Sequence, residues 1–327
     1  MIRLGLIGCG EHAEIGHAIS LARYRSAHDD EIELTAACDL QQKRAQHFCQ
    51  KYGFTSAYSN TEEMLNEANL DGCIAVVPPE MISKVAIMLL QRGIPCVVEK
   101  PLGASRTDLS LLLAAAKETQ TSNMVSVNRR FMPFLNCALE WARTAGPLRY
   151  VYGRMKRHGR RESEFIWTTA VHAVDALRYM AGEVSQANWR RMNSANTADW
   201  YAIDLRFKNG IYGHIDVLPT SGVLEETYEL SGEGFHATVT CPFGPERSVR
   251  CFQDNKLVLE KIAGSDTPED VLQGFYEEAA EFIRALHKKA KPHPSIEEVF
   301  PSVELCFMMA NSSQENQVIV DDNQNFQ

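Results

Sequence analysis

The sequence predicts an α/β protein: an N-terminal doubly wound parallel sheet, then a C-terminal α+β domain built on an antiparallel sheet. Three observations predict this fold. Short, continuously apolar runs alternate with helical patterns over residues 1–128, a glycine-rich turn follows the first run, and later strands alternate with a period of two. Continuous apolar strands are typical of a parallel sheet covered on both faces, whereas alternation is typical of a sheet with one open face.

The first domain contains five predicted strands separated by predicted helices. One helix ends at Gly53 and another at Gly93. Ser59, with Glu62 three residues later, is a capping-box signature and predicts the beginning of a helix. The five strands are "IRLGLIG", "IELTAACD", "GCIAVV", "PCVVEK" and "NMVSVN".

The pattern changes after Arg130, so we expect a first domain over residues 1–128 and a second over 129–327. A helix is expected around "FMPFLNCALEWART". In "WYAIDLRFKNGIYGHIDV" apolar residues alternate, and Asn209-Gly210 is the favoured two-residue hairpin turn. Further strands are predicted in "EETYELSGEGFHATVTC" and "SVRCFQDNKLVLEKI", and final helices in "GFYEEAAEFIRALHKKA" and "SVELCFMMANSSQ".

Composition restricts the classes of function. A length of 327 residues suits two domains, and the net charge of −9 argues against a broad nucleic-acid or anionic-membrane surface. The nine cysteines include no CxxC pair, so neither a zinc framework nor a disulfide scaffold is predicted, and no metal is expected. The N-terminus lacks the apolar segment of a signal peptide, and no segment is long enough to span a membrane. We therefore expect a cytoplasmic protein with reduced thiols that binds neither nucleic acid nor membranes.

A GxGxxA motif ends the first predicted strand. Gly8 permits a tight turn, Gly10 lets backbone amides approach a pyrophosphate, and Ala13 allows close packing of helix on strand. The helix that follows directs its positive N-terminus at the phosphates. With a strand before it and a helix after it, this motif predicts a dinucleotide site.

Asp39 ends the second predicted strand, where it is placed to accept hydrogen bonds from the ribose of NAD. It lies 26 residues past Ala13, a somewhat long interval. The alternative is that Asp39 is an ordinary N-cap of the next helix. We expect NAD as the cofactor, because a carboxylate at Asp39 accepts both ribose hydroxyls and repels a 2′-phosphate. Lys43 and Arg44 lie one helical turn beyond Asp39 and soften this preference, so NADP is the alternative.

Lys100 ends the fifth predicted strand, in the stretch "VVEKPLG". In an open parallel sheet the ligand lies beyond the carboxyl ends of the strands, so Lys100 is expected at the nicotinamide crevice. A positioned ammonium can hold a substrate oxygen or lower the pKa of a hydroxyl. Glu99 could accept hydrogen bonds from ribose or hold the lysine. The alternative is a surface ion pair at a strand end.

These motifs resemble the Gfo/Idh/MocA oxidoreductases, the relatives of glucose-fructose oxidoreductase and inositol dehydrogenase, over nearly the whole chain. The resemblance implies an NAD(P)-binding Rossmann domain, a second domain with a large, mostly antiparallel sheet, and a Lys100–Pro101 bond that is often cis. It also implies a homodimer or homotetramer formed through the C-terminal sheet. The motifs that carry it are Gly8-x-Gly10-x-x-Ala13, Asp39, Glu99-Lys100-Pro101, Asn128-Arg129-Arg130-Phe131 and His172-x-x-Asp175. The cofactor contacts that it implies include Glu11, His12, Pro79 and Asn128.

By the same resemblance, His172 is the second catalytic residue, a general base that removes a hydroxyl proton. The alternative is a satisfied core histidine. Helical spacing in "WTTAVHAVDALRYMAG" places Thr168, His172, Asp175 and Tyr179 on one face. Two departures from the family pattern are that Thr168 stands where many members have aspartate, and that Pro78-Pro79-Glu80 replaces a Thr-Pro-Asn loop.

A basic segment, "KRHGRRESEFIW", precedes His172 and suggests an anionic sugar derivative as substrate, because arginine binds carboxylate or phosphate in a bidentate way. The alternative is a solvated loop, or arginines paired with Glu162 and Glu164 or with another subunit. The residues assigned to the substrate on this basis are Arg157, Arg160, Arg161, Trp167, Thr168 and Asp175.

The expected function is therefore reversible hydride transfer between a nicotinamide cofactor and a secondary hydroxyl of a small, sugar-like substrate. Lys100 is expected to polarise the oxygen and His172 to take the proton. Two alternatives stay open: a redox-neutral epimerase or eliminase that uses bound NAD, and a non-catalytic, dinucleotide-dependent ligand sensor.

Overall fold

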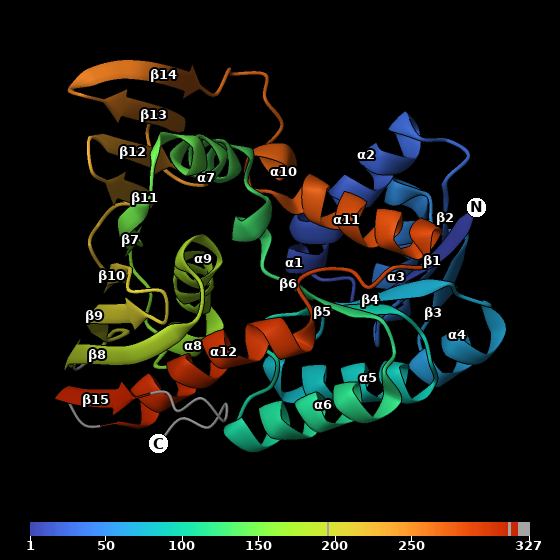
Figure 1. Cartoon of the computed structure of the whole chain (residues 1–327). Helices are drawn as coiled ribbons and strands as arrows, with labels where there is room; N and C mark the ends of the chain where they lie inside the picture. The colour runs from blue at the N-terminus through green and yellow to red at the C-terminus, as the bar shows by residue number, and fades with distance from the viewer. Residues whose placement is uncertain (195, 313–314, 320–327) are drawn as a thin grey trace. The chain divides into compact units, whose positions relative to one another are not determined.

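The computed structural model describes residues 1–194, 196–312 and 315–319. It divides into two compact units (Figure 1). The first unit comprises Met1–Val127 and Gly274–Pro301, and the second comprises Asn128–Gln273 and the chain from Ser302 onward. The expected second domain, 129–327, therefore lacks the segment Gly274–Pro301. That segment returns to the first unit because its helix α11 (Phe275–Lys288) buries an apolar face there.

The first unit is built on a six-stranded parallel sheet in the order β3-β2-β1-β4-β5-β6. β1 lies near the middle and pairs with both β2 and β4, so the glycine turn that follows it lies where the strand order reverses. This is a doubly wound sheet, as the sequence predicted. Its strands are β1 (Ile2–Ile7), β2 (Ile32–Cys38), β3 (Ser56–Tyr58), β4 (Gly72–Ala75), β5 (Cys96–Glu99) and β6 (Asn123–Ser126).

Helices cover both faces of this sheet: α5 and α6 lie on one side, and α2 and α11 on the other (Figure 1). β4 and β5 are buried along their whole length, which explains their continuous apolar sequence. The helical elements are α1 (Glu11–Ala13), a π-helical turn η1 (Glu14–Ala18), α2 (Ile19–Ala27), α3 (Gln42–Tyr52), α4 (Thr61–Glu67), α5 (Pro79–Gln91), α6 (Arg106–Thr119) and α11.

The predicted helix boundaries agree with the structure at two glycines and differ at one cap. Gly53, with φ +79°, ends α3, and Gly93, with φ +70°, follows the end of α5. The predicted capping box at Ser59 is displaced by one residue. Asn60 is the N-cap of α4, and its side-chain oxygen accepts from the backbone N–H of Glu63 at 3.2 Å. The amide oxygen of asparagine caps a helix as well as a serine hydroxyl does.

The second unit is built on a nine-stranded sheet in the order β14-β13-β12-β11-β7-β10-β9-β8-β15. Among the strand pairs of the described residues, only β7–β10 is parallel, so the sheet is mostly antiparallel, as expected. Asn209-Gly210 lies in the turn between β9 and β10. The strands are β7 (Leu148–Lys156), β8 (Val184–Met192), β9 (Trp200–Phe207), β10 (Tyr212–Leu218), β11 (Glu225–Gly232), β12 (Phe235–Thr240), β13 (Ser248–Gln253), β14 (Lys256–Ile262) and β15 (Glu315–Ile319).

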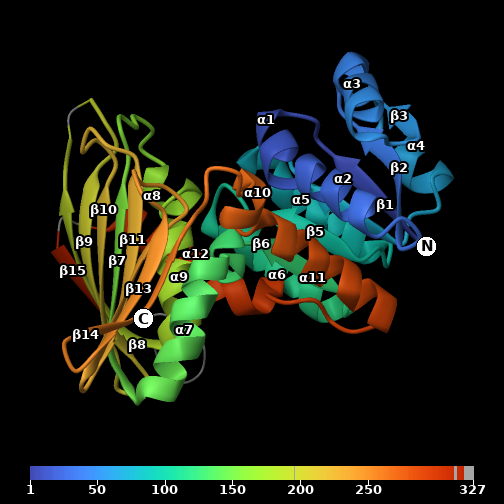
Figure 2. The same cartoon turned by 90° about the horizontal axis from the view of Figure 1, so that it is seen from above.

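Helices of the second unit cover one face of its sheet (Figure 2). The inward residues of β9 to β11 are buried and, apart from Glu226 of β11, apolar, whereas mostly polar and aromatic side chains alternate with them on the other face. The helices are η2 (Asn128–Phe131, 3₁₀), α7 (Pro133–Ala145), α8 (Phe165–Thr168), α9 (Val171–Ala181), α10 (Glu269–Leu272) and the later part of α12 (Ile296–Asn311). Within the described residues, no helix is both long enough and apolar enough to cross a membrane.

Candidate active site

In the glycine turn after β1, packing requires a glycine at position 8, whereas Gly10 leaves space beside the backbone. Gly8 has φ +91°, and a Cβ added there would lie 1.9 Å from the carbonyl oxygen of Val76. A Cβ added to Gly10 would meet no atom within 4 Å. The backbone at Gly10 is therefore open to a ligand, and this is the surface that the diphosphate of a dinucleotide needs.

The helix after this turn starts at Glu11, passes through the π-helical turn η1, and continues as α2. Ala13 is fully buried, in agreement with its predicted role as a small residue between helix and sheet. π-Helical turns within α-helices occur often at functional sites. Here the turn contains His17, whose ring lies in the interior of the unit.

Asp39 follows β2 and binds the glycine turn directly. One carboxylate oxygen accepts the backbone N–H of Cys9 at 2.9 Å, and the other accepts that of Gln41 at 2.8 Å. The N-cap position of α3 is held by Gln41, so Asp39 is not that N-cap. Each carboxylate oxygen has a further lone pair, and together they can accept ribose hydroxyls.

An open cavity of about 410 Å³ lies between the glycine turn and α3. Burial, with a contribution from Asp39, raises the pKa of the Cys9 thiol to about 12, so Cys9 lines the cavity as a neutral thiol. Lys51 and Tyr52 both bind Glu14, which reduces the negative charge at the rim. The lining residues are Cys9, Gly10, Glu11, Glu14, Lys43, Arg44, His47 and Phe48.

Glu99 ends β5 and is 3% exposed. Its Oε1 lies 2.8 Å from Nε2 of His17 and 3.1 Å from Nε2 of His12, and its Oε2 accepts the backbone N–H of Lys100 at 3.0 Å. Burial by itself raises the pKa of Glu99, but the two imidazoles outweigh burial and hold that pKa well below its usual range. Glu99 is thus an ionised carboxylate that joins the end of β5 to the helix after the glycine turn.

Lys100 is half-buried directly after β5, and its peptide bond to Pro101 is cis. Pro79 is the first residue of α5, at the carboxyl end of β4. The first unit therefore brings Gly10, Asp39, Pro79, Glu99 and Lys100 to one edge of the parallel sheet. Asn128 belongs instead to the second unit, where it donates to the carbonyl of Gln273 at 2.8 Å and accepts from Arg129 at 2.9 Å.

His172 lies on α9 of the second unit and is 6% exposed. Asp175, one turn later, is fully buried and is bound by Arg130 through two hydrogen bonds of 2.7 and 2.8 Å. It also accepts from the hydroxyl of Ser302 at 2.8 Å. The charge of Asp175 is therefore compensated within the fold.

Thr168 and His172 do not lie on one continuous helix, contrary to the expectation. Thr168 ends the short helix α8, and α9 begins at Val171 after a break at Thr169. The hydroxyl of Thr168 donates to the carbonyl of Glu164 at 2.9 Å. Trp167 stacks on Phe307 with ring centroids 5.1 Å apart, which gives it a packing role within the second unit.

The basic segment is largely paired inside the second unit. Arg157 is 5% exposed and forms an ion pair with Glu226, and Lys156 lies 2.6 Å from Glu225. Arg160 pairs with Glu162, as the alternative reading proposed, and lies 5.2 Å above the ring of Phe165. Arg157 is therefore held inside the fold, whereas Arg161 is exposed and the side chain of Arg160 is 42% exposed beside its partner.

The main residue that sequence reasoning missed is Glu226. It is fully buried and accepts from Arg129 at 2.6 and 3.1 Å, from Arg157, and from the hydroxyl of Tyr228 at 2.9 Å. Burial raises the pKa of Glu226, but the two guanidiniums outweigh burial and lower it from 4.5 to about 2. A signal was present, since the period of two in "EETYELSG" places Glu226 on the same face as Tyr228 and Leu230.

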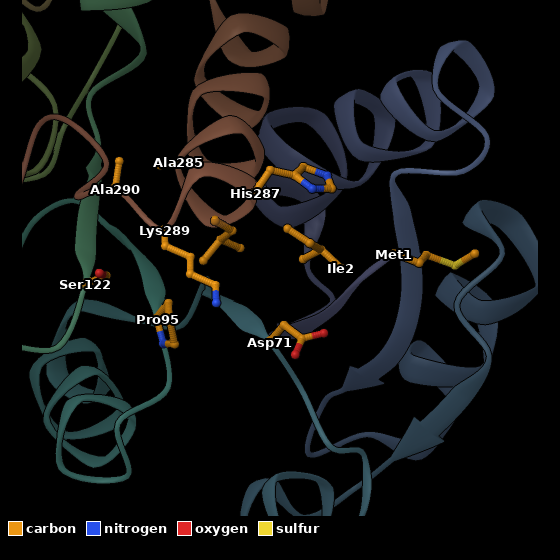
Figure 3. Close-up of a pocket in the computed structure, with 10 residues that line it drawn as sticks. Met1, Ile2, Asp71, Pro95, Ser122, Ala285, His287, Lys289 and Ala290 are labelled. Carbon is orange, nitrogen blue, oxygen red and sulfur yellow. The ribbon is translucent and has the colours of Figure 1, made fainter.

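A second cavity, of about 490 Å³, lies at the opposite edge of the parallel sheet (Figure 3). Ile2, Asp71, Pro95 and Ser122 line it, and each lies at or next to the amino end of a strand. Arg3 pairs with Asp71 through two bonds of 3.0 and 3.1 Å. Ligands of doubly wound sheets bind beyond the carboxyl ends, so this cavity is separate from the candidate active site. Among the described residues, no group of three or more metal-binding side chains comes together in either unit.

Residues 2–128 match the family described as "Oxidoreductase family, NAD-binding Rossmann fold". The match confirms the expectation of an NAD-binding domain of an oxidoreductase. It covers the open glycine turn, Asp39, Glu99 and Lys100.

Two curated enzymes are similar to this chain. A 4-carboxy-2-hydroxymuconate-6-semialdehyde dehydrogenase from Sphingobium sp. is 26% identical over 203 residues, covering 57% of this chain and 61% of that enzyme. D-apiose dehydrogenase from Paraburkholderia graminis is 26% identical over 278 residues, covering 80% of this chain and 70% of that enzyme. The chain thus matches about three-fifths of the length of the first enzyme and a larger share of the second.

The fold of nearly the whole chain is similar to a solved structure, the dehydrogenase MviM from Clostridium difficile. The TM-score is 0.83, with 18% identity, over 95% of this chain and 99% of that protein. The likeness extends through the second unit, and it confirms the expected combination of a parallel and a mostly antiparallel sheet.

Proposed function

Because residues 2–128 belong to the Gfo/Idh/MocA oxidoreductase family, we propose that this chain is an NAD(P)-dependent dehydrogenase that acts on a secondary hydroxyl of a sugar, polyol or sugar derivative. The observation that carries the proposal is the arrangement at the carboxyl edge of the parallel sheet. There the open backbone at Gly10, the carboxylate of Asp39 and the side chain of Lys100 lie in one unit.

The residues of the first unit have distinct proposed roles. The backbone at Gly10 binds the diphosphate, and Asp39 accepts the ribose hydroxyls. When bound, the nicotinamide supplies the hydride acceptor. The ammonium of Lys100 holds the substrate oxygen and stabilises its developing negative charge. In the second unit, His172 takes the hydroxyl proton as the general base.

Asp39 favours NAD over NADP, since a carboxylate fixed by two backbone amides repels a 2′-phosphate. Lys43 and Arg44 line the adjoining cavity and reduce this preference. We expect tighter binding of NAD than of NADP in a fluorescence titration of the two reduced cofactors. Tighter binding of NADP would reverse the assignment and identify the two cations as the phosphate site.

The similarity to D-apiose dehydrogenase supports a sugar-like substrate. The anionic substrate inferred from the basic segment has less support, because Arg157 and Arg160 are paired within the fold. If the substrate is anionic, Arg161 is the arginine of this segment that we expect to bind it. The substrate panel must therefore contain both neutral and acidic sugars.

The test is to purify the protein, identify any nucleotide that co-purifies, and follow absorbance at 340 nm with NAD and a panel of aldoses, polyols, uronic acids and sugar phosphates. We expect NADH to accumulate with at least one neutral sugar or polyol. If bound nucleotide stays oxidised with every compound, the dehydrogenase proposal fails, and a redox-neutral enzyme or a ligand sensor takes its place.

We also propose that two copies associate through the open face of the nine-stranded sheet. Tyr150 and Tyr212, opposite each other on β7 and β10, are large aromatic residues exposed on that face. Aromatic residues are enriched in protein interfaces. Light scattering should report a dimer or tetramer that Tyr212→Glu weakens, whereas a wild-type monomer would overturn this proposal.

A further inference from the structure

The contact between His12 and Glu99 has a chemical consequence beyond holding the helix in place. Nε2 of His12 lies 3.1 Å from Oε1 of Glu99, and the side chain of His12 is half exposed. The ring packs edge-on against Phe275, with centroids 6.4 Å apart. His12 thus has one nitrogen directed at a buried carboxylate while part of its ring reaches solvent.

The ionised carboxylate of Glu99 determines which nitrogen of His12 carries the proton. A carboxylate only accepts hydrogen bonds, so Nε2 must be the donor. In the neutral ring Nδ1 is then an acceptor, and it repels a phosphate oxygen. Adding a proton turns Nδ1 into a donor and makes the ring a cation. Protonation therefore changes His12 from a ring that repels an anion to one that binds it.

His12 lies close to where the diphosphate binds. It is two residues past Gly10, whose backbone is open, and its Nε2 contacts Glu99 at the carboxyl end of β5. The cavity beside α3 is lined by Gly10 and Glu11 but not by His12. The ring therefore lies on the β5 side of the glycine turn, between the turn and the residue that precedes Lys100.

We propose that His12 is a proton-dependent contact for the cofactor diphosphate: its imidazolium binds Glu99 with Nε2 and the diphosphate with Nδ1. Cofactor affinity then falls as His12 loses its proton. This inference rests on the cofactor site of the proposed function and adds a regulation of that site. His12 acts on the cofactor and, through Glu99, on the position of Lys100.

The other charged groups around His12 do not supply the same dependence. On its own helix, Glu11 is an exposed carboxylate, and Glu14 is bound by Lys51 and Tyr52. His17 is buried against the same oxygen of Glu99. Lys100 directly follows Glu99 in the chain. Ser126 lies opposite Glu99 on the neighbouring strand β6, and its hydroxyl donates to Glu278 of α11 at 2.7 Å. Of the two histidines that face Glu99, only His12 is exposed.

The test measures the dissociation constant of NADH from pH 6 to 9 by fluorescence titration, without any sugar substrate. We expect the wild-type constant to rise about fivefold over this range, the scale of one screened charge–charge contact. His12→Gln keeps a donor for Glu99 but cannot gain a proton, so its constant should stay flat. His28→Gln is the matched control, because His28 also faces a glutamate, Glu31 at 3.6 Å, and is similarly exposed. That variant should keep the wild-type dependence.

Two further measurements show whether the pH dependence comes from contact between His12 and the diphosphate. ADP-ribose, which has the diphosphate and no nicotinamide, should show the same dependence, whereas adenosine should show none. Binding of NADH must also raise the midpoint of the His12 Cε1–H titration in proton NMR of the wild type by roughly 0.7 pH unit, because linkage is reciprocal. This last measurement needs no variant, so it decides the proposal even if His12→Gln fails to fold.

A wild-type constant that does not change with pH, equal dependence in wild type and His12→Gln, or an unchanged midpoint on NADH binding each overturns the proposal. None of these readouts involves turnover. A failure here is therefore distinct from a failure to find a substrate.

Discussion

Each unit contains a buried glutamate, and the two differ in the residues that compensate them. Glu226 in the second unit is held by Arg129, Arg157 and the hydroxyl of Tyr228. Glu99 in the first unit is held by His12 and His17. Arginine stays charged at all physiological pH values, whereas histidine can gain or lose its charge. The structural anion thus has permanent partners, and the anion beside the cofactor site has adjustable ones.

The surroundings reinforce this difference. The guanidiniums of Arg129 and Arg157 lie 5.8 and 5.0 Å from the centre of the Phe243 ring, so both are held on an aromatic face inside the second unit. The cluster joins η2, the end of β7 and β11. Near Glu99, by contrast, His12 reaches solvent. The cluster around Glu226 stabilises the second unit. In the cluster around Glu99, the charge of His12 can change when a ligand binds.

The largest expected effect is on stability, from Glu226→Ala. The variant leaves two buried guanidiniums without their anion, so we expect the free energy of unfolding to fall by about 3–5 kcal/mol in urea denaturation. Glu225→Ala is the matched control, since Glu225 is the adjacent residue and its pair with Lys156 is partly exposed. Glu225→Ala should lower the free energy of unfolding by less than about 1 kcal/mol. Equal losses in the two variants would remove Glu226 from its structural role.

Glu99→Gln should lower the free energy of unfolding less than Glu226→Ala does, by about 1–3 kcal/mol. The imidazoles that face Glu99 can become neutral, whereas the arginines that face Glu226 cannot. The comparison is direct when Glu226→Gln and Glu99→Gln are unfolded in the same buffer. A greater loss from Glu99→Gln would mean that the histidine cluster is the more rigid of the two.

The pH dependence of stability follows from the lowered pKa of Glu226. Its pKa falls from 4.5 to about 2 in the fold, so its contribution is present above about pH 4.5 and is lost as the pH falls toward 2. The difference in urea midpoint between wild type and Glu226→Gln should therefore narrow between pH 5 and pH 3. A gap that is constant over this interval would show that the charge of Glu226 does not stabilise the fold.

Much of the first unit could be predicted from sequence because its signals are local. The glycine turn, each buried strand and the lysine after β5 are each recognised from a few consecutive residues. The second unit was harder, since Arg157 and Glu226 are 69 residues apart and their pairing needs the β7–β11 register. The return of Gly274–Pro301 and the break at Thr169 also depend on packing that no short pattern contains.

The smallest effect is expected from the pair Arg160→Ala and Arg161→Ala. Arg160 has its partner in Glu162 and Arg161 is exposed, so we expect a loss of stability below about 1 kcal/mol. KM should change equally, and little, for the best neutral and the best acidic substrate. A KM that rises selectively for the acidic substrate, and less so at higher salt, would restore the anionic substrate class.

Lys100→Ala shows whether the carboxyl end of β5 carries the chemistry of a dehydrogenase. The measurement is the rate of NADH formation at 340 nm with saturating NAD and the best substrate, together with the dissociation constant of NADH. We predict that kcat falls at least ~100-fold while NADH binding stays within about threefold of wild type, because the ammonium acts on the substrate oxygen. Near-normal turnover in this variant would contradict the account.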